Sequence, residues 1–282
     1  MPGSSDDIAV PAVTVPDDRI LSELVRLGFS DALIAKPRRL IVSSSGADAT
    51  GKTAWALTAP EPIVFFDIDL GMEGVAHKAQ EEGKHIYRYQ VRMRRQEKKD
   101  VYEALWTNLE SRLKKAWGLK RGTVIIDTAS EAFEIARLAA FGRLTQVQPH
   151  NYTQVNNEWR DLLTHAYDSR MNTIFIHKVK AVWLNTTDSK GQLKSIKTKD
   201  TEVAGFGEMN YLPQVNIVHL RQDDPTADPP TTTFSVAITK CRHSPSITGM
   251  VIEGLPLEQG DERAVDPLCN FNTLLDLVHG VE

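Results

Sequence analysis

The feature that most constrains the fold is the stretch IVSSSGADATGKTAW at residues 41–55. An apolar run enters this stretch, a helix-like segment leaves it, and its centre matches the spacing GxxxxGKT. The specified positions are occupied by Gly46, Gly51, Lys52 and Thr53. Glycine lets the backbone wind closely around an anion, and the N–H groups of such a loop favour anionic oxygens. The pattern therefore predicts a phosphate-binding loop between a strand and a helix.

The residues of this phosphate loop (residues 46–53) predict how a nucleotide binds. We expect Lys52 to reach the β- and γ-phosphates of ATP and the Thr53 hydroxyl to ligate Mg²⁺. The expected nucleotide contacts are Gly46, Ala47, Asp48, Ala49, Thr50, Gly51, Lys52, Thr53 and Ala54. Asp48 is unusual, because an acid inside a phosphate loop must point away from the phosphates or lie near a cation. A glycine-rich turn without a ligand is the alternative interpretation.

Strand-like and helix-like segments alternate through the first two thirds of the chain. Apolar patterning predicts strands at 38–45, 62–70, 84–91, 123–128 and 172–180, and helices at 51–58, 97–117, 130–144 and 156–170. This alternation predicts an α/β fold with a mostly parallel sheet and helices on both faces. Further strands at 214–222, 231–241 and 249–254 indicate a β-rich extension of one side of the sheet, and 270–280 a closing helix.

Composition bounds the partners and the compartment. The net charge of −4 excludes a uniformly basic nucleic-acid binder, so any nucleic-acid contact needs a local patch. Two cysteines favour a reducing compartment, hence the cytoplasm. No apolar run approaches the roughly 20 residues of a membrane span, so we expect no membrane partner. Residues 1–18 resemble a flexible arm, followed by a short helix at 19–35.

Two acidic segments follow predicted strands and supply candidate catalytic groups. In VIIDT, Asp127 ends an apolar strand, where a carboxylate can hold Mg²⁺ beside Thr53. The alternative is a helix cap, although Thr128 or Ser130 could cap instead. FFDIDLGMEG carries Asp67, Asp69 and Glu73 at a strand exit. Asp69 is the candidate for orienting the attacking water, with loop capping or solvation as the alternative.

Two later segments offer further site residues. His177 follows the apolar TIFI and is a candidate sensor of the γ-phosphate, although a lone histidine is often structural. Lys240 and Arg242 lie two residues apart at a strand end, on one face. Directed outward, they could complete a neighbouring subunit's nucleotide site. A basic strand edge that prevents sheet aggregation is the equally weighted alternative.

Two basic stretches contain aromatic residues. They are RYQVRMRRQEKK at 88–99, with Tyr89, and the segment 177–199, with Trp183 and the lysines Lys178, Lys180, Lys190, Lys194, Lys197 and Lys199. Basic groups interleaved with aromatic rings suit single-stranded nucleic acid through phosphate contact and base stacking. A solvated charged face is the commoner explanation of such runs.

Taken in order, GADATGKT, FFDIDLGMEG, VIIDT, FIHK and ITKCRHSPSITGMV resemble the RecA-like ATPases, and most of all the small phage RecA-like single-strand annealing proteins. The resemblance covers about residues 38–254. It implies a RecA-like P-loop NTPase fold with one ATPase domain over 19–282 and a core at 38–254. It also implies that Asp127 is the Walker B acid and that Lys240 and Arg242 reach the adjacent subunit's ATP.

The same resemblance implies that Asp69 stands where these proteins usually carry glutamate, that His177 stands at their polar sensor, and that DNA-facing loops lie within 181–212. The sequence thus predicts an ATPase with ATP and Mg²⁺ as ligands, self-assembly into a ring or filament, and single-stranded DNA annealing in recombination or replication. A single-stranded DNA-binding protein is a further expected partner. One alternative is a small-molecule kinase, although this sequence shows no obvious arginine-rich lid segment. Another is a non-catalytic nucleotide-binding assembly protein.

Overall fold

The computed structural model describes residues 22–23, 26–28, 39–94, 98–144, 147–187, 193–258, 261 and 266–280. The chain divides into two units, Met1–Pro37 and Arg38–Glu282. The predicted arm at 1–18 and most of the predicted helix at 19–35 lie outside the described residues. The elements below all belong to the second unit.

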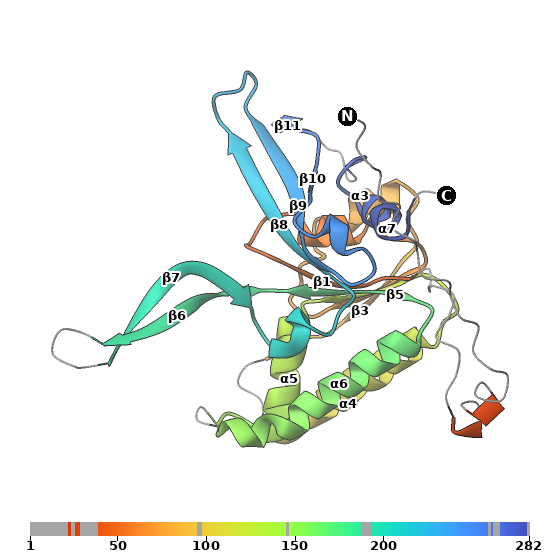
Figure 1. Ribbon diagram of the computed structural model, residues 1–282, viewed down its shortest axis with the longest axis vertical. Coiled ribbons are helices and arrows are strands. Elements are labelled where there is room, and N and C mark those ends of the chain that lie inside the picture. The colour runs from red at the N-terminus through yellow and green to blue at the C-terminus, as the bar shows by residue number, and fades with distance from the viewer. Residues whose placement is uncertain are drawn as a thin grey trace, which may run out of the picture. The chain divides into compact units, whose positions relative to one another are not determined.

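A mixed sheet forms the centre of this unit (Figure 1). Its strand order is β10-β9-β8-β1-β5-β4-β2-β3, with β11 also paired to β9. The strands are β1 (Ile41–Gly46), β2 (Ile63–Asp67), β3 (Ile86–Gln90), β4 (Thr123–Asp127), β5 (Asn172–His177), β8 (Val215–Asp224), β9 (Thr231–Cys241), β10 (Val251–Glu253) and β11 (Leu257–Glu258). Strands from β8 to β3 in this order pair in parallel, whereas β9 is antiparallel to β8, and β10 and β11 are antiparallel to β9. The predicted α/β class and its β-rich C-terminal extension are confirmed.

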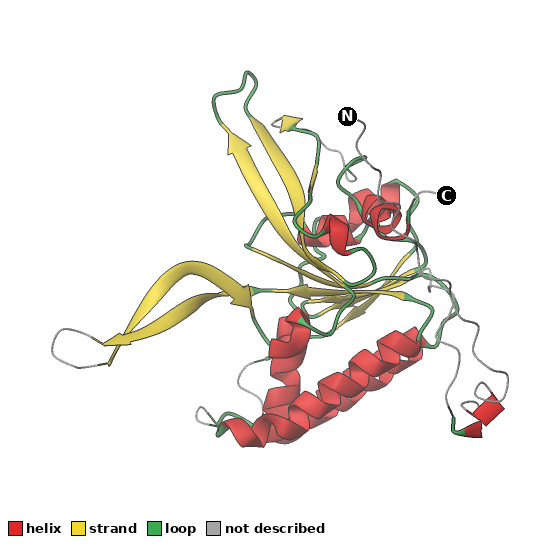
Figure 2. Cartoon of the chain, in the orientation of Figure 1, coloured by secondary structure: helices red, strands yellow, loops and turns green. Residues whose placement is uncertain are grey.

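Helices cover both faces of the sheet (Figure 2). They are α2 (Lys52–Ala56), α3 (Ala76–Glu81), α4 (Lys99–Trp117), α5 (Ala129–Phe141), α6 (Thr153–Asp168) and α7 (Phe271–His279). Three short 3₁₀ helices are η1 (Pro149–Tyr152), η2 (Gly207–Asn210) and η3 (Pro245–Ile247). The helices α4, α5 and α6 pack on one face, and α2, α3 and α7 on the other.

The core forms because each central strand is apolar on both sides. In β2, Phe66 packs toward α4 and α5, while its neighbour Phe65 packs toward α2 and α7. Successive strand side chains point to opposite faces, so such runs bury both. Each fully buried phenylalanine contributes roughly 1.5–3 kcal/mol relative to an exposed one. On α4, Trp106, Leu109 and Leu113 recur at helical spacing and are buried against the sheet.

A two-stranded hairpin, β6 (Val179–Thr187) with β7 (Leu193–Val203), lies outside the sequence predictions. The predicted strand at 172–180 is wrong in its end, because β5 stops at His177 and β6 begins at Val179. The hairpin extends from this point away from the main sheet (Figure 1). Its valines, isoleucine and threonines favour strands, but the interspersed lysines dilute the apolar pattern that prediction needs.

Candidate functional site

The phosphate loop joins β1 to α2 at the carboxyl edge of the parallel strands. Gly51 precedes the helix with φ of 81°, a left-handed conformation that favours glycine. A Cβ atom on Gly46 would lie 2.8 Å from the carbonyl oxygen of His219, so this glycine lets the end of β1 lie close to β8. Thr50 Oγ1 donates a 2.8 Å hydrogen bond to the carbonyl of Ala47 and closes the turn. The residue types of the motif thus follow from the local backbone geometry.

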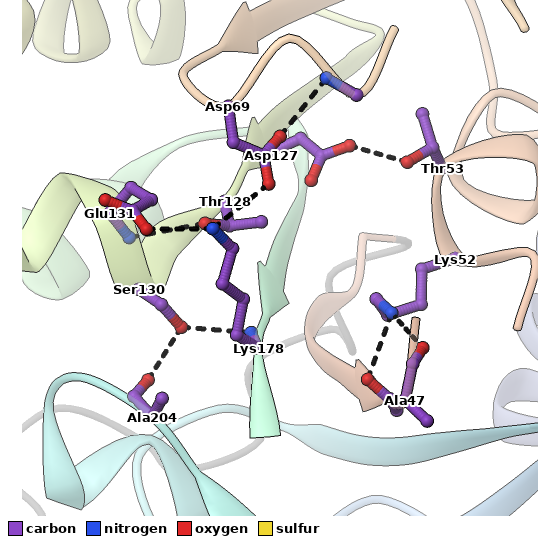
Figure 3. Close-up of polar contacts among 12 residues, drawn as sticks. Ala47, Lys52, Thr53, Asp69, Asp127, Thr128, Ser130, Glu131, Lys178 and Ala204 are labelled. Atoms are coloured by element: carbon purple, nitrogen blue, oxygen red, sulfur yellow. Dashed lines mark hydrogen bonds and ion pairs between the residues drawn. The ribbon is translucent and has the colours of Figure 1, made fainter. Parts of the chain in front are cut away.

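Lys52 is held at the mouth of the loop. Its Nζ donates hydrogen bonds to the carbonyl oxygens of Gly46 at 3.0 Å and Ala47 at 2.5 Å (Figure 3). Burial lowers the pKa of Lys52, and the charges of Asp48 and Asp127 oppose that change. Charged phosphate oxygens are stronger acceptors than backbone carbonyls, so the ammonium is placed to exchange these partners for a nucleotide.

Asp48, the unusual acid of the loop, is exposed and stands close enough to Lys52 for its charge to raise the pKa of that ammonium. Of the two expectations for this residue, proximity to a cation describes the structure.

Asp127 ends β4 and faces the start of α2. Its Oδ2 accepts a 2.7 Å hydrogen bond from Thr53 Oγ1, and only 2 % of the residue is exposed (Figure 3). Burial raises the pKa of Asp127 to about 6, and the charges of Asp69 and Asp67 add to the effect. The α5 cap is instead Thr128, whose Oγ1 accepts a hydrogen bond from a backbone N–H at 3.3 Å. Asp127 is therefore not consumed as a helix cap.

Asp69 lies beyond the end of β2 in an ion-paired cluster. Its Oδ2 is 3.5 Å from Lys178 Nζ, which also lies 2.8 Å from Glu131 Oε1 (Figure 3). A Cβ atom on Gly71 would lie 3.0 Å from Asp69 Oδ1 and 3.3 Å from Asp127 Oδ2. The absence of a side chain at Gly71 therefore lets both carboxylates face the same space.

The other two acids of the segment take different positions. Asp67, the last residue of β2, is fully buried and accepts a hydrogen bond from Arg88 of β3. Glu73 is exposed. Neither is placed as Asp69 is, beside Lys178 and across Gly71 from Asp127.

Two buried histidines flank the loop strand. His177 ends β5 opposite Ser45, and His219 lies on β8 opposite Gly46. Burial lowers the pKa of each to about 3, so both rings are neutral near pH 7. His219 Nε2 lies 2.9 Å from Ser44 Oγ, whereas the ring nitrogens of His177 make no hydrogen bond of standard geometry among the described residues. His177 thus offers a neutral polar group beside the loop.

Lys240 and Arg242 lie near the amino ends of the parallel strands, at the end of the sheet opposite the phosphate loop. Lys240 pairs with Asn216 at the start of β8, whereas the phosphate loop begins at Gly46, opposite His219 of the same strand. Asn216 and His219 are three residues apart, which is about 10 Å along a strand. Both side chains donate hydrogen bonds to the carbonyl of Tyr211, and Lys240 also donates to that of Pro213 at 2.7 Å. These contacts hold the two side chains on their own chain, away from its phosphate loop.

Four groups at the site were not predicted as catalytic: Lys178, Glu131, Gly71 and His219. Lys178 follows His177 directly and appears in the sequence only as part of a basic stretch. Its acidic partners are 109 and 47 residues away, by the numbering of Asp69 and Glu131. Alternation within the strand 214–222 is the one signal that could have marked His219 as buried.

A family model described as an AAA domain matches residues 37–206. The match spans more than half of the chain and includes the phosphate loop, Asp69, Asp127 and His177. The chain belongs to the AAA domain family. It is therefore a P-loop AAA-type ATPase, and membership implies use of a nucleotide, typically with Mg²⁺. Comparison with curated proteins yields no match.

The site of this AAA protein fits Mg²⁺ in the way nucleotide enzymes hold it. Among the described residues no three His, Cys, Asp or Glu side chains form a metal cluster by themselves. Mg²⁺ in such enzymes is bound through one or two carboxylates together with substrate phosphates. Thr53 and the buried Asp127 carboxylate, 2.7 Å apart, provide the oxygen ligands for that arrangement.

The resemblance to phage single-strand annealing proteins stays a prediction.

No helix within the described ranges of this AAA protein has the length and apolarity required to cross a membrane.

Proposed function

We propose that this AAA protein hydrolyses ATP between the subunits of a ring or filament and uses the cycle to bind and anneal single-stranded DNA in recombination or replication. One observation carries the proposal. The basic hairpin β6–β7 begins two residues after the buried His177, at the edge of the sheet where the phosphate loop and both candidate catalytic acids lie. The nucleotide site and the candidate DNA-contacting element therefore share one junction.

The reaction is in-line attack of water on the γ-phosphate: a bond forms from the water oxygen to the γ-phosphorus as the bond to the bridging oxygen breaks, and ADP leaves. In this proposal Asp69 orients the water and accepts its proton; the closeness of its carboxylate to the space near Gly71 that Asp127 also faces supports the role. Lys52 neutralises charge on the phosphates. Lys178 holds Asp69 by an ion pair, and Glu131 in turn anchors Lys178. When bound by Thr53 and Asp127, Mg²⁺ would supply charge neutralisation at the β- and γ-phosphate oxygens.

The proposal also includes a basic side chain that a neighbouring subunit supplies to the γ-phosphate. Lys240 and Arg242 lie at the end of the sheet opposite their own phosphate loop, which supports a role for them at the nucleotide of another subunit. Arg242 is exposed and its guanidinium bonds one backbone carbonyl, a partner that a phosphate can replace. An arginine supplied in trans stabilises charge in the transition state.

The hairpin supplies the proposed DNA contact. Residues 179–203 contain five lysines against three acidic residues, in a chain whose net charge is −4. Lys197 is exposed, whereas Lys180 pairs with Glu202 at 3.2 Å. Phosphate contacts by such lysines give salt-dependent binding that does not require a particular sequence.

Hydrogen bonds connect the base of the hairpin to Lys178, the ion-pair partner of Asp69. Ser130 Oγ donates to the carbonyl of Ala204, which directly follows β7, at 2.8 Å, and accepts from the backbone N–H of Lys178 at 3.0 Å. A cavity of about 370 Å³ is lined by Gly46 and Ala47 of the phosphate loop and by Val179 and Val203 of the hairpin. A change at the nucleotide therefore has a short route to the hairpin base.

The first experiment measures ATPase activity with and without single-stranded DNA, and DNA binding with and without ATP at low salt. Hydrolysis stimulated by DNA, and DNA binding strengthened by ATP, are expected. Lys52→Ala serves as the inactive reference. Absence of hydrolysis together with absence of DNA binding under all these conditions would reject the proposal.

The inter-subunit arginine is tested by mixing variants. Lys52→Ala and Arg242→Ala should each be inactive as pure assemblies. Mixed together, they form some interfaces that pair an intact phosphate loop with an intact Arg242, so the mixture should regain activity up to about a quarter of wild type. A mixture as inactive as its components, in oligomers shown to exchange subunits, contradicts a role in trans.

The hairpin lysines are tested by charge reversal. Lys197→Glu should weaken DNA binding and reduce the dependence of affinity on salt by about one phosphate contact. Lys115→Glu, an exposed reversal of the same type on α4, is the matched control. Equal affinities and salt slopes for the two variants would show that Lys197 belongs to a solvated face. A single-stranded DNA-binding protein remains a proposed partner for the same assays.

A further inference from the structure

A small cavity adjoins the phosphate loop on the side away from the catalytic acids. Its volume is about 150 Å³, well above the roughly 30 Å³ share of one water molecule. The lining includes Gly51, Ala54, Trp55, Phe234, Ser235 and Leu257. Two of these belong to the predicted nucleotide contacts, and the others come from α2, β9 and β11.

The sheet order places this cavity and the acids on opposite sides of the loop. His177 ends β5, Asp127 ends β4 and Asp69 follows β2; these three strands lie on one side of β1. The cavity is bounded by His219 of β8 and by Phe234 of β9, on the other side of β1. A nucleotide whose γ-phosphate faces the acids can direct its nucleoside end toward β8 and β9.

Aromatic side chains form the walls. A Cβ atom on Gly51 would lie 3.3 Å from the Phe234 ring, so the ring stands directly against the phosphate loop. Only 5 % of the surface of Trp55 is exposed. Its indole Nε1 is a buried donor without a hydrogen-bond partner in the described part of the chain. Buried donors are normally satisfied, so an acceptor atom on a ligand would relieve this one.

The lining offers no positively charged group to a ligand. The pKa of His219 is lowered to about 3 by burial, so its ring carries no charge. The oxygens of Asp266 already accept hydrogen bonds from the backbone N–H groups of Leu255, Leu268 and Cys269, at 2.7, 2.8 and 2.9 Å. The cavity therefore suits an uncharged planar ring and not a phosphate.

We propose that this cavity is the base-binding pocket, in which Phe234 stacks on the purine base of the nucleotide held by the same chain's phosphate loop. The inference rests on the proposed nucleotide binding and adds the residues that recognise the base. Base–aromatic stacking contributes enough free energy that a nucleotide should bind measurably more tightly than its phosphate chain without the base.

The test compares the binding of ATP and of inorganic tripolyphosphate by titration calorimetry with Mg²⁺. Phe234→Ala removes the ring, and Ser235→Leu fills the cavity. Each should weaken ATP binding roughly 5- to 100-fold, the range for loss of one stack, while tripolyphosphate binding stays within about twofold of wild type. Phe234→Tyr keeps the ring and should bind ATP as wild type does. Leu220→Ala, on β8 opposite Ser235 and outside the cavity lining, is the control truncation.

The outcomes separate this inference from the proposed function. Unchanged ATP affinity in both variants overturns the base pocket and leaves the cavity to another occupant, such as an apolar side chain of a second copy. Equal weakening of ATP and tripolyphosphate also overturns it, because the variants then act on the loop. If wild type binds neither ligand, the proposed nucleotide function itself fails.

Discussion

Replacing Asp127 with asparagine should stabilise the metal-free protein at neutral pH while abolishing Mg²⁺-dependent ATP hydrolysis. Asparagine has nearly the same shape, and its side-chain carbonyl can still accept the Thr53 hydrogen bond that Asp127 Oδ2 accepts at 2.7 Å. The change removes a buried negative charge that burial and two nearby acids destabilise. A functional carboxylate that lowers stability is a known form of trade-off between activity and stability.

The magnitude follows from the pKa of Asp127. Its rise from 3.8 to about 6 corresponds to about 3 kcal/mol, at about 1.36 kcal/mol for each pKa unit. Because the native state holds the proton more tightly, the free energy of unfolding falls as pH rises from about 4 to about 6. The stabilisation by Asp127→Asn should therefore be near zero below pH 4, about half complete at pH 5 and about 3 kcal/mol at pH 7.

The assay is equilibrium urea unfolding of both proteins at pH 4, 5 and 7 in the presence of a chelator. Groups remote from Asp127 titrate alike in both proteins, so the difference reports Asp127 and its interactions with its charged neighbours. Asp69→Asn is the control: it relieves repulsion of Asp127 but loses the ion pair with Lys178 at 3.5 Å, so its gain should be clearly smaller. Adding Mg²⁺ and ATP should raise the stability of wild type but not of Asp127→Asn.

Two results would refute this reasoning. The first is an Asp127→Asn variant that is no more stable than wild type at pH 7. The second is a gain that does not change between pH 4 and pH 7, because a pH-independent gain would come from packing and not from the carboxylate charge.

Three further predictions concern other residues at the site. Lys178→Met should lower kcat for ATP more than tenfold with little change in KM, and Lys178→Arg should restore part of it, in steady-state ATPase assays. Gly46→Ala should lower the free energy of unfolding by about 1–3 kcal/mol, because its Cβ would lie 2.8 Å from a backbone carbonyl; urea unfolding measures this. His177→Gln should reduce the loss of folding stability as pH falls from about 6.5 to about 3. The buried native histidine, with a pKa of about 3, resists the protonation that the unfolded state accepts in this range, and unfolding curves at a series of pH values measure the difference.

Much of the site could be predicted from local patterns. The phosphate loop is contiguous, and its glycines, lysine and threonine are needed within eight residues, so the motif alone identified it. Asp127 could be found because it ends a strongly apolar strand, and the competing cap assignment fell to Thr128. The parallel sheet followed from alternating strands and helices, whose periodicities differ.

The hairpin β6–β7 was missed for a physical reason. A two-stranded ribbon has no apolar face as continuous as that of a central strand, so the segment 179–203 lacks the pattern by which strands are predicted. Its pairing depends on cross-strand contacts between residues up to 24 positions apart, as for Val179 and Val203.

The sequence by itself determined that a nucleotide phosphate site lies between a strand and a helix, because that chemistry resides in neighbouring residues. Only the tertiary structure decided what surrounds the phosphates. Sheet order brought Lys178 to Asp69 and placed the Phe234 cavity on the opposite side of the loop. It also put Lys240 and Arg242 at the end of the sheet opposite the phosphate loop. These relations join residues distant in the chain, and strand pairing alone makes them neighbours.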